Sequence, residues 1–325
     1  MIEVIELTKH YGRGNTVRAA VDRLTFTVRP GTVTGFLGPN GAGKSTTLRM
    51  ILGLNDPTAG TVTVDGRPFR GRPRGLRHVG ALLDAGDVHG GRTARAHLRA
   101  LARSNRIPAA RVEEVLAEVG LAEAAGRRIR GYSLGMKQRL GIAGALLGDP
   151  PVLLFDEPLN GLDPEGVLWV RGLFRRLAAE GRTVFVSSHM MAEMEHTADR
   201  LVVIGRGRLI ADESLTEFAA RAGRATVTVR AAEPDRLAAV LTAAGATVRP
   251  GPEAALTATG RAGALTATGP EDTLTVTGLD DRRIGELALE NGLLLYALTT
   301  RGASLEEAFM ALTADSVEYL AGEPR

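Results

Sequence analysis

Short apolar runs recur through the first 220 residues of the chain. The runs EVIEL, LTFTV, TVTGFL, PVLLFD, TVFVSS and RLVVIG each span five or six residues, and helical or turn-rich stretches separate them. Several runs are apolar at consecutive positions, which is typical of strands buried on both faces. Strands of that kind belong to parallel sheets covered by helices. The pattern therefore predicts an α/β fold with a mainly parallel sheet.

Two stretches between Thr93 and Gly120 have helical spacing instead. TARAHLRALARSN begins with Thr93, a residue type that caps helix N-termini, and PAARVEEVLAEVG ends with Gly120, a residue type that ends helices. Because both stretches interrupt the strand pattern, we expect an inserted helical subdomain over about residues 86–150.

The pattern changes after Arg221. Strand-like ATVTVRA is followed by helix-like PDRLAAVLTAAG, strand-like ATVR, a repetitive segment, helix-like DDRRIGELALENG, strand-like LLLYALT and helix-like SLEEAFMALT. This β-α-β-β-α-β order with one more helix predicts a separate small α+β domain. We therefore expect two domains, residues 1–221 and residues 222–325.

A nine-residue repeat lies inside the second region. LTATG occupies residues 256–260 and 265–269, and LTVTG occupies residues 274–278. Alternating threonine and apolar residues closed by glycine favour short hairpin strands. We interpret the repeat as a duplicated hairpin, and a ligand-binding sheet edge is the alternative.

The positive charge comes almost wholly from arginine. Lysine occurs only at positions 9, 44 and 137 among 40 basic residues, and the formal net charge is +3. Because arginine stays protonated, this small excess is weak evidence for nucleic-acid binding, and we expect no specific nucleic-acid partner. The absence of cysteine excludes disulfides and thiolate metal sites. No apolar run approaches the roughly 18 residues of a membrane span, so we expect a cytoplasmic location.

The stretch GPNGAGKS fits the phosphate-binding pattern G-x-x-x-x-G-K-S, and it lies between the strand-like TVTGFL and the helix-like TTLRMILGL. Its glycines let successive backbone N–H groups point at phosphates, Lys44 adds a charge, and the Ser45 hydroxyl suits Mg²⁺. A glycine-rich turn without a nucleotide is the alternative. The residues expected to contact the nucleotide are Gly38, Pro39, Asn40, Gly41, Ala42, Gly43, Lys44, Ser45 and Thr46.

Two more strand ends carry candidate chemistry. VLLFDEP ends in two carboxylates, and we expect Asp156 to hold Mg²⁺ while Glu157 polarises an attacking water. TVFVSSH ends at His189, a candidate sensor of the terminal phosphate. A solvated strand end and a surface histidine are the alternatives. With Lys44, these residues give the expected catalytic set Lys44, Glu157 and His189.

A third stretch, GYSLGMKQRLGIAGALLGD, sets a polar turn before an apolar helix. Ser133 occupies the position of a helix cap, and a helix N-terminus favours an anion. The chain already has a phosphate site at residues 38–46, so this second one needs a separate explanation.

The order of GPNGAGKS, YSLGMKQRL, VLLFDEP, NGLD and SSH resembles the nucleotide-binding subunits of ATP-binding cassette (ABC) transporters over residues 1 to about 220. The resemblance implies the ABC type of P-loop NTPase, with a β subdomain and a helical subdomain added to the parallel sheet. The whole chain resembles the drug-resistance group of exporters, whose ATPase subunits carry a small C-terminal domain.

The resemblance also implies ATP and Mg²⁺ as cofactors and a head-to-tail dimer with a second copy of the chain. In that dimer Ser133 and Gly135 would contact the ATP held by the P-loop of the other subunit, which explains the second phosphate site. Asp163 of NGLD matches the segment that runs along the interface, and Tyr11 matches the aromatic residue that stacks on adenine. An ordinary half-buried tyrosine is the alternative for Tyr11.

Two positions depart from the family pattern. The family usually has a glutamine after the strand near residue 80, but here Asp84 of VGALLDAG stands in that place and Gln138 is the only glutamine in the chain. We expect Asp84 to take over the metal contact through a carboxylate oxygen. In the signature, Leu134 and Met136 replace the usual glycine and glutamine, while Ser133 and Gly135 are kept.

Three functional hypotheses follow. The first is the ATP-hydrolysing motor of an exporter of drug, antibiotic or lipid-like cargo, peripheral on the inner face of the cell membrane and bound to a separate multi-span permease. The second is a soluble cassette ATPase that acts on ribosomes or nucleic acid. The third is a regulatory role for the C-terminal domain, which would coexist with ATPase activity.

Overall fold

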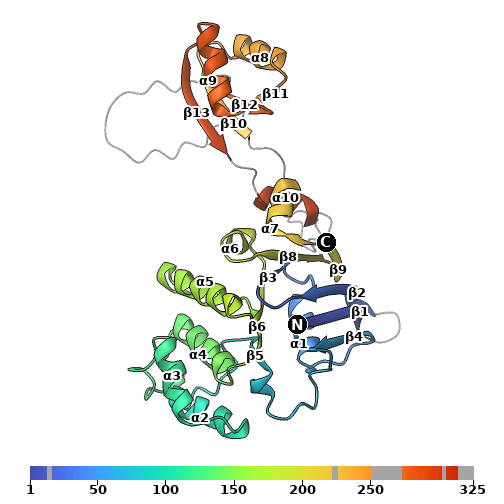
Figure 1. The fold of residues 1–325 in the computed structure, drawn as a ribbon, viewed down its shortest axis with the longest axis vertical. Coiled ribbons are helices and arrows are strands. Elements are labelled where there is room, and N and C mark those ends of the chain that lie inside the picture. Colours follow the sequence, from blue (N-terminus) through green and yellow to red (C-terminus); the bar gives the residue numbers. More distant parts are fainter. Residues whose placement is uncertain (13–16, 222–225, 251–272, 302–304, 314–325) are drawn as a thin grey trace, which may run out of the picture. The chain divides into compact units, whose positions relative to one another are not determined.

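The computed structural model describes residues 1–12, 17–221, 226–250, 273–301 and 305–313. They form two compact units (Figure 1). The larger unit contains Met1–Phe218 together with the chain from Phe309, and the smaller contains Ala219–Ala308.

The larger unit is built on a six-stranded sheet in the order β5-β6-β7-β3-β8-β9. The first five of these strands run parallel, and β9 pairs antiparallel with β8. This arrangement confirms the expected mainly parallel sheet. The strands are β5 (Val79–Leu82), β6 (Val152–Asp156), β7 (Thr183–Ser188), β3 (Val33–Leu37), β8 (Arg200–Gly205) and β9 (Arg208–Ser214).

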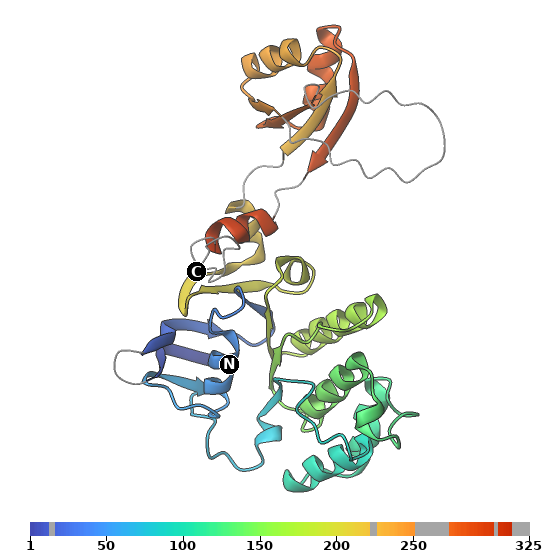
Figure 2. The same ribbon diagram turned by 180° about the vertical axis from the view of Figure 1, so that it is seen from behind.

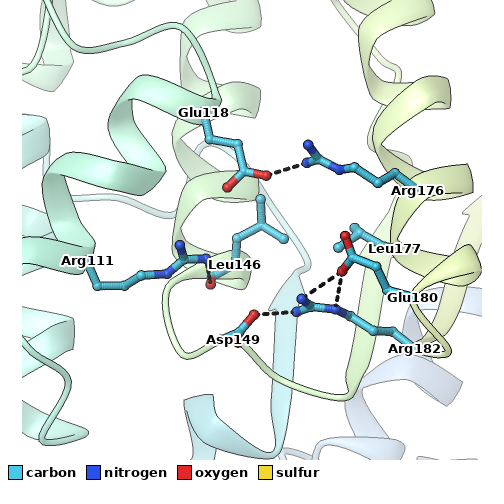
Figure 3. Close-up of a pocket in the computed structure, with 8 residues that line it drawn as sticks. All are labelled: Arg111, Glu118, Leu146, Asp149, Arg176, Leu177, Glu180 and Arg182. Atoms are coloured by element: carbon cyan, nitrogen blue, oxygen red, sulfur yellow. Dashed lines mark hydrogen bonds and ion pairs between the residues drawn. The ribbon is translucent and has the colours of Figure 1, made fainter.

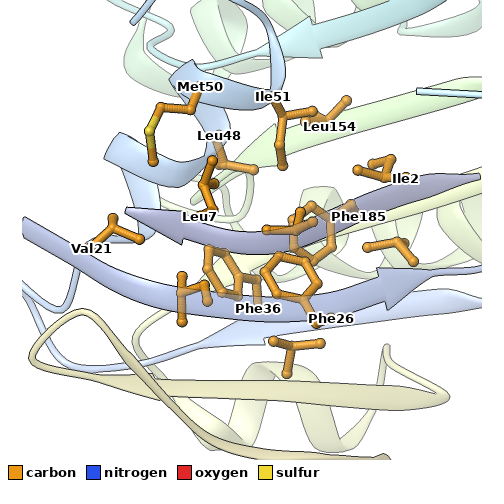
Figure 4. Packing of buried hydrophobic residues seen from close by; sticks show 14 of the residues in the cluster. Ile2, Leu7, Val21, Phe26, Phe36, Leu48, Met50, Ile51, Leu154 and Phe185 are labelled. Atoms are coloured by element: carbon orange, nitrogen blue, oxygen red, sulfur yellow. The ribbon is translucent and has the colours of Figure 1, made fainter. Parts of the chain in front are cut away.

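A second, antiparallel sheet of three strands forms the β subdomain, in the order β2 (Arg18–Val28), β1 (Ile2–Tyr11) and β4 (Ala59–Val64). Phe26 of β2 lies 5.6 Å from Phe36 of β3 and 5.8 Å from Phe185 of β7, measured between ring centroids. Figure 4 shows these rings within a larger apolar cluster that also takes in Leu48 and Ile51 of α1. The two sheets therefore share one core, and α1 is fixed on it.

Helices complete the larger unit. Thr93 caps α2 as the sequence predicts, because its side chain accepts a hydrogen bond from Ala96 N at 3.1 Å. In both views α2, α3 and α4 lie together at one end of the parallel sheet, as the expected helical subdomain (Figures 1 and 2). The helices are α1 (Lys44–Ile51), α2 (Ala94–Ser104), α3 (Ala110–Glu118), α4 (Leu134–Leu146), α5 (Pro164–Ala179), α6 (Met191–Glu195) and α7 (Leu215–Arg221), whose last three residues belong to the smaller unit. In the described part of the chain, no helix is long and apolar enough to cross a membrane.

The smaller unit has the predicted β-α-β-β-α-β order and a sheet of four antiparallel strands, β11-β12-β10-β13. Val227 and Val229 of β10 and Leu274 and Val276 of β12 point to one buried face, and Leu237 of α8 packs into the same core. The elements are β10 (Thr226–Ala231), α8 (Pro234–Ala243), β11 (Thr247–Pro250), β12 (Thr273–Thr277), α9 (Asp281–Glu290) and β13 (Leu295–Arg301).

The nine-residue repeat lies only partly within the described residues. The third copy of the repeat forms β12 and ends at Gly278, which has a left-handed φ of +100°. The copies at 256–260 and 265–269 lie outside the described residues.

We expected α10 (Leu305–Thr313) to belong wholly to the C-terminal domain, but its second half, from the buried Phe309 onward, groups with the larger unit. The local sequence determines that these residues form a helix, whereas the contacts of the helix's apolar face determine which unit it joins.

Candidate functional site

The carboxyl ends of three parallel strands meet at one edge of the large sheet. Leu37, the last residue of β3, pairs with Ser188 of β7, and Asp156, the last residue of β6, pairs with Ser187. Because the strands are in this register, the residues that follow them lie side by side. The predicted phosphate loop, carboxylates and histidine are thereby brought together.

The loop that joins β3 to α1 has the geometry of a phosphate cradle. Gly41 and Gly43 have φ values of +81° and +103°, a left-handed backbone that favours glycine. A Cβ at Gly43 would lie 2.4 Å from the carbonyl oxygen of Ala20. The loop therefore lies close to the β subdomain and ends at the N-terminus of α1, where backbone N–H groups and the helix dipole favour an anion.

Lys44 lies inside this loop with only 7% of its side chain exposed. Its Nζ donates hydrogen bonds to the carbonyl oxygens of Gly38, at 2.6 Å, and Pro39, at 3.3 Å. Burial lowers the pKa of Lys44 below its ordinary value, and the nearby carboxylates of Glu157 and Asp156 oppose part of that shift. The ammonium group is thus a desolvated cation held where an anionic ligand would meet it.

Glu157 lies between Lys44 and His189. Its Oε1 is 3.6 Å from Lys44 Nζ, and its Oε2 is 2.9 Å from His189 Nδ1. The backbone of Glu157 is left-handed, with a φ of +47°, a conformation that costs energy in a non-glycine residue. Two contacts hold it there: Glu157 N donates to Ser187 Oγ at 3.0 Å, and Gln138 Nε2 donates to the Glu157 carbonyl at 3.2 Å.

Oxygen atoms that suit a hard cation flank the loop. Asp156 accepts a hydrogen bond from Ser187 Oγ, and Ser45 is exposed at the start of α1. Asp84 follows β5, the strand next to β6, and its Oδ1 accepts a hydrogen bond from Gly86 N at 2.6 Å. The described residues contain no group of three or more histidine, aspartate or glutamate side chains that could hold a metal by themselves. A cation here would need phosphate and water oxygens as well.

The signature stretch has a geometry of its own. Ser133 caps α4, as predicted, because its Oγ accepts a hydrogen bond from Met136 N at 3.2 Å. A Cβ at Gly135 would lie 3.3 Å from the carbonyl oxygen of Gly161, so the start of α4 packs against the NGLD loop. Asp163 of that loop caps α5 by accepting from Gly166 N at 2.8 Å.

Tyr11 lies at the end of β1 and is 45% exposed. Asn55 Nδ2 donates to its hydroxyl at 3.0 Å, and the Lys9 ammonium lies 5.2 Å from the centroid of its ring. The ring is therefore held in place with part of its surface open, as a stacking platform would require.

Two residues that organise the site, Gln138 and Ser187, are not predicted from the sequence. Gln138 is buried, and it joins α4 to the strand end that carries Glu157. The Ser187 hydroxyl accepts a hydrogen bond from Glu157 N and donates one to the Asp156 carboxylate, so it contacts both residues. The only signals in the sequence are the single glutamine of the chain and the polar SS pair that closes an apolar strand.

A separate hollow of about 200 Å³ lies among α3, α5 and the segment between α4 and β6 (Figure 3). Its charges are paired: Arg182 binds Asp149 at 2.7 Å and Glu180 at 2.8 Å, and Arg176 binds Glu118. Because acids and bases neutralise one another there, we interpret the hollow as an ionic contact between the helical subdomain and the helix α5.

The phosphate loop, its lysine and the carboxylates at the adjacent strand ends define a P-loop NTPase. A family model described as "ABC transporter" matches residues 21–160, and one described as "Domain of unknown function (DUF8746)" matches residues 260–306.

Two curated relatives are similar to the chain over 213 residues. The "Uncharacterized ABC transporter ATP-binding protein YhcH" of Bacillus subtilis is 40% identical, and the "Bacitracin transport ATP-binding protein BcrA" of Bacillus licheniformis is 41% identical. Each match covers 65% of this chain and 68% of the relative. Among solved structures, the dimeric post-hydrolysis state of the ATP-binding cassette MJ0796 bound to ADP and Pi has a TM-score of 0.62 and 25% identity. That match covers 66% of this chain and 99% of MJ0796.

The chain therefore belongs to the ATP-binding subunits of ABC transporters, which are ATPases that couple ATP hydrolysis to transport. The matches to the relatives and to the solved structure cover about two thirds of the chain.

Proposed function

We propose that the chain is the motor subunit of an exporter, that it closes head to tail with a second copy around two ATP molecules, and that it drives a separate multi-span permease. The observation that carries the proposal is the position of Glu157, held between Lys44 and His189 beside the phosphate loop. A complete set of catalytic groups supports a hydrolytic site rather than a degenerate one.

The residues present fit ATP. Lys44 is a buried cation at the start of α1, and Gly41 and Gly43 have the left-handed backbone by which a glycine-rich loop turns its N–H groups toward a phosphate. Tyr11 supplies an open ring for adenine. The phosphate contacts we assign are those of residues 38–46.

The same edge fits Mg²⁺. The Ser45 hydroxyl and an Asp156 carboxylate oxygen are hard oxygen donors of the kind that Mg²⁺ takes together with phosphate and water. We assign Asp84 as a third donor, because β5 places it beside β6 at the same sheet edge. When bound, the ion would neutralise charge on the phosphates.

Each residue then has one task. Glu157 accepts a proton from the attacking water, and His189 fixes the Glu157 carboxylate through Oε2. Lys44 stabilises negative charge on the terminal phosphate, in a site where burial strengthens the interaction. Gln138 and Ser187 hold the strained backbone at Glu157 and so position its side chain.

The start of α4 supports completion of the site by a second copy. Ser133 makes its hydrogen bonds within its own helix, and Leu134 beside it is 55% exposed. An exposed helix N-terminus capped by serine suits the phosphate of a nucleotide bound elsewhere. We therefore assign Ser133, Gly135 and Asp163 to the ATP held by the partner's P-loop.

Export of an antibiotic-like cargo is supported by the relative named for bacitracin transport. A motor subunit of this kind would work at the inner face of the cell membrane while bound to its permease. We assign no cargo contacts to this chain.

Affinity purification of tagged Glu157→Gln chain from ATP-treated, detergent-solubilised host membranes tests the proposal. The expected result is one multi-span protein in a fixed ratio to the chain, identified by mass spectrometry. Purification of the Lys44→Ala chain without ATP is the matched control. Ribosomal or nucleic-acid-bound partners without any membrane protein would favour the soluble ATPase instead.

A further inference from the structure

The four-stranded sheet of the smaller unit has two edges of opposite character. β11 spans four residues and carries Arg249 and Pro250, features that discourage addition of another strand. β13 spans seven residues, and the segment Leu293–Thr300 that includes most of it contains no charged residue and no proline. Within the described ranges β13 pairs with β10 alone, at the outer side of the sheet (Figure 1). Natural sheets usually block such an edge, so this one is suited to pairing with a further strand.

Exposed apolar side chains gather at the same edge. In the described part of the smaller unit, the large apolar side chains that are exposed all lie between residues 289 and 298. They are Leu289, Leu294, Tyr296 and Leu298, with exposed fractions of 83%, 62%, 56% and 36%. A concentration of this kind beside an unblocked edge marks an interaction surface rather than scattered surface residues.

One flank of α9 extends that surface. Thr300 Oγ1 of β13 donates to Asp281 Oδ2 of α9 at 2.9 Å, so the flank that carries Asp281 faces β13. Gly285 and Leu289 follow at intervals of four residues and lie on the same flank. A Cβ at Gly285 would meet nothing within 4 Å. Among the residues that the structure describes, nothing covers this flank, which sets a small residue and an apolar residue beside the edge.

We propose that β13 pairs antiparallel with β13 of a second copy of this chain, so that the two small units form one continuous sheet about a twofold axis. The lack of charge on the strand is the reason for choosing a second copy. In a twofold pair each strand lies beside its own copy, so a charged side chain near the axis would lie close to an identical charge. From Leu295 to Thr300, β13 has no charged residue. Leu289 and Tyr296 pack across the same axis.

This association needs no nucleotide and uses no residue of the P-loop or the signature. It is therefore separate from the ATP-driven closure proposed above, so a result that contradicts one of the two proposals leaves the other intact. Sedimentation of the full chain after removal of nucleotide and Mg²⁺ tests it. We expect wild type and Lys44→Ala to sediment at twice the monomer mass at micromolar concentration.

Substitutions at two exposed positions test whether this surface forms the interface. Leu289→Glu and Tyr296→Glu place like charges at the axis, and each is expected to give a monomer with unchanged ATPase activity per chain in the absence of the permease. Ala239→Glu, an exposed position on α8, is the matched control and stays dimeric. A monomeric wild type, or a dimer that survives Leu289→Glu and Tyr296→Glu together, would overturn the proposal.

Disulfide formation provides an independent readout, because the chain has no cysteine of its own. Antiparallel neighbours across a twofold axis lie close enough for a disulfide. Among single cysteines placed one at a time at positions 296 to 300, the one nearest the twofold axis is expected to cross-link one β13 to the other without nucleotide, and full-register pairing puts mid-strand Leu298 there. Thr247→Cys on β11 is the control and stays uncross-linked. No cross-link at any of the five positions, or an equal yield from Thr247→Cys, contradicts the pairing.

Discussion

Gln138 Nε2 donates to the carbonyl oxygen of Glu157 at 3.2 Å, and through a second hydrogen bond of the same length to the carbonyl of Asn160. One buried amide thereby ties α4, the helix that Ser133 caps, to the strand end that carries Glu157, the proposed catalytic base. The two parts of the site that meet different nucleotides in the proposed dimer are thus joined within one chain.

Replacing Gln138 with leucine should therefore slow catalysis without removing any group from the active site. Two hydrogen bonds to partly buried carbonyls are lost, which costs about 1–3 kcal/mol of unfolding free energy. We expect kcat to fall while the affinity for ATP is retained, because the P-loop does not contact Gln138. Urea unfolding, ATP binding and steady-state ATPase rates would measure the three effects. Lys137→Ala, the adjacent position on α4, is the control, and equal losses in both variants would contradict the positioning role.

Lys44→Met should stabilise the fold while abolishing ATP binding. The pKa of Lys44 is lowered from its ordinary 10.5 chiefly by burial, so the folded protein disfavours the charged ammonium. We expect the variant to gain about 1 kcal/mol of unfolding free energy at neutral pH.

The pH dependence of that gain follows from the direction of the shift. The penalty for burying a charged Lys44 is complete below its folded pKa and is relieved as the pH rises toward the unfolded value, where both states lose the proton. The advantage of Lys44→Met over wild type should therefore shrink from pH 7 toward pH 10. Urea titrations of both proteins at several pH values would measure it, and an advantage that grows with pH would contradict the assignment.

Two conservative substitutions test whether Asp84 contacts the metal ion. An asparagine side chain at this position would keep an oxygen for the hydrogen bond from Gly86 N, so Asp84→Asn should leave the loop folded while weakening a metal contact. We expect a several-fold higher Mg²⁺ requirement for ATPase activity, and partial recovery in Asp84→Gln, which restores the residue usual in the family. Asp87→Asn, an exposed neighbour, is the control. An unchanged Mg²⁺ titration of Asp84→Asn would remove Asp84 from the metal site.

The sequence predicts those parts of the molecule whose signals are local. The β3 strand, the phosphate loop and α1 follow one another without interruption. Asp156 ends β6, Glu157 follows it directly and His189 directly follows β7, so parallel pairing is enough to assemble them. The contact from Gln138 to Glu157 joins residues 19 positions apart, and it depends on the packing of α4 against β5, the strand beside β6. Helical spacing alone could not assign that role to Gln138.

The same distinction holds for α10 and for the edges of the small sheet. The pattern of SLEEAFMALT predicts a helix, but the unit that its second half joins depends on which surface buries Phe309. Likewise the run LLLYALT predicts a strand, and only the strand order places it at an open edge. Side-chain patterns specify elements, whereas long-range contacts specify their partners.

In the proposed dimer the signature of one chain meets the ATP held by the other, and cross-linking between two chains measures that contact. Two single-cysteine chains in the Glu157→Gln background are mixed, one with Asn40→Cys in the P-loop and one with Leu134→Cys in the signature. Both positions are exposed, and neither chain can cross-link these two sites internally. We expect a short bifunctional maleimide to join the two chains in the presence of ATP and Mg²⁺ and far less without them. No cross-link with ATP, or the same yield without it, would rule out this dimer.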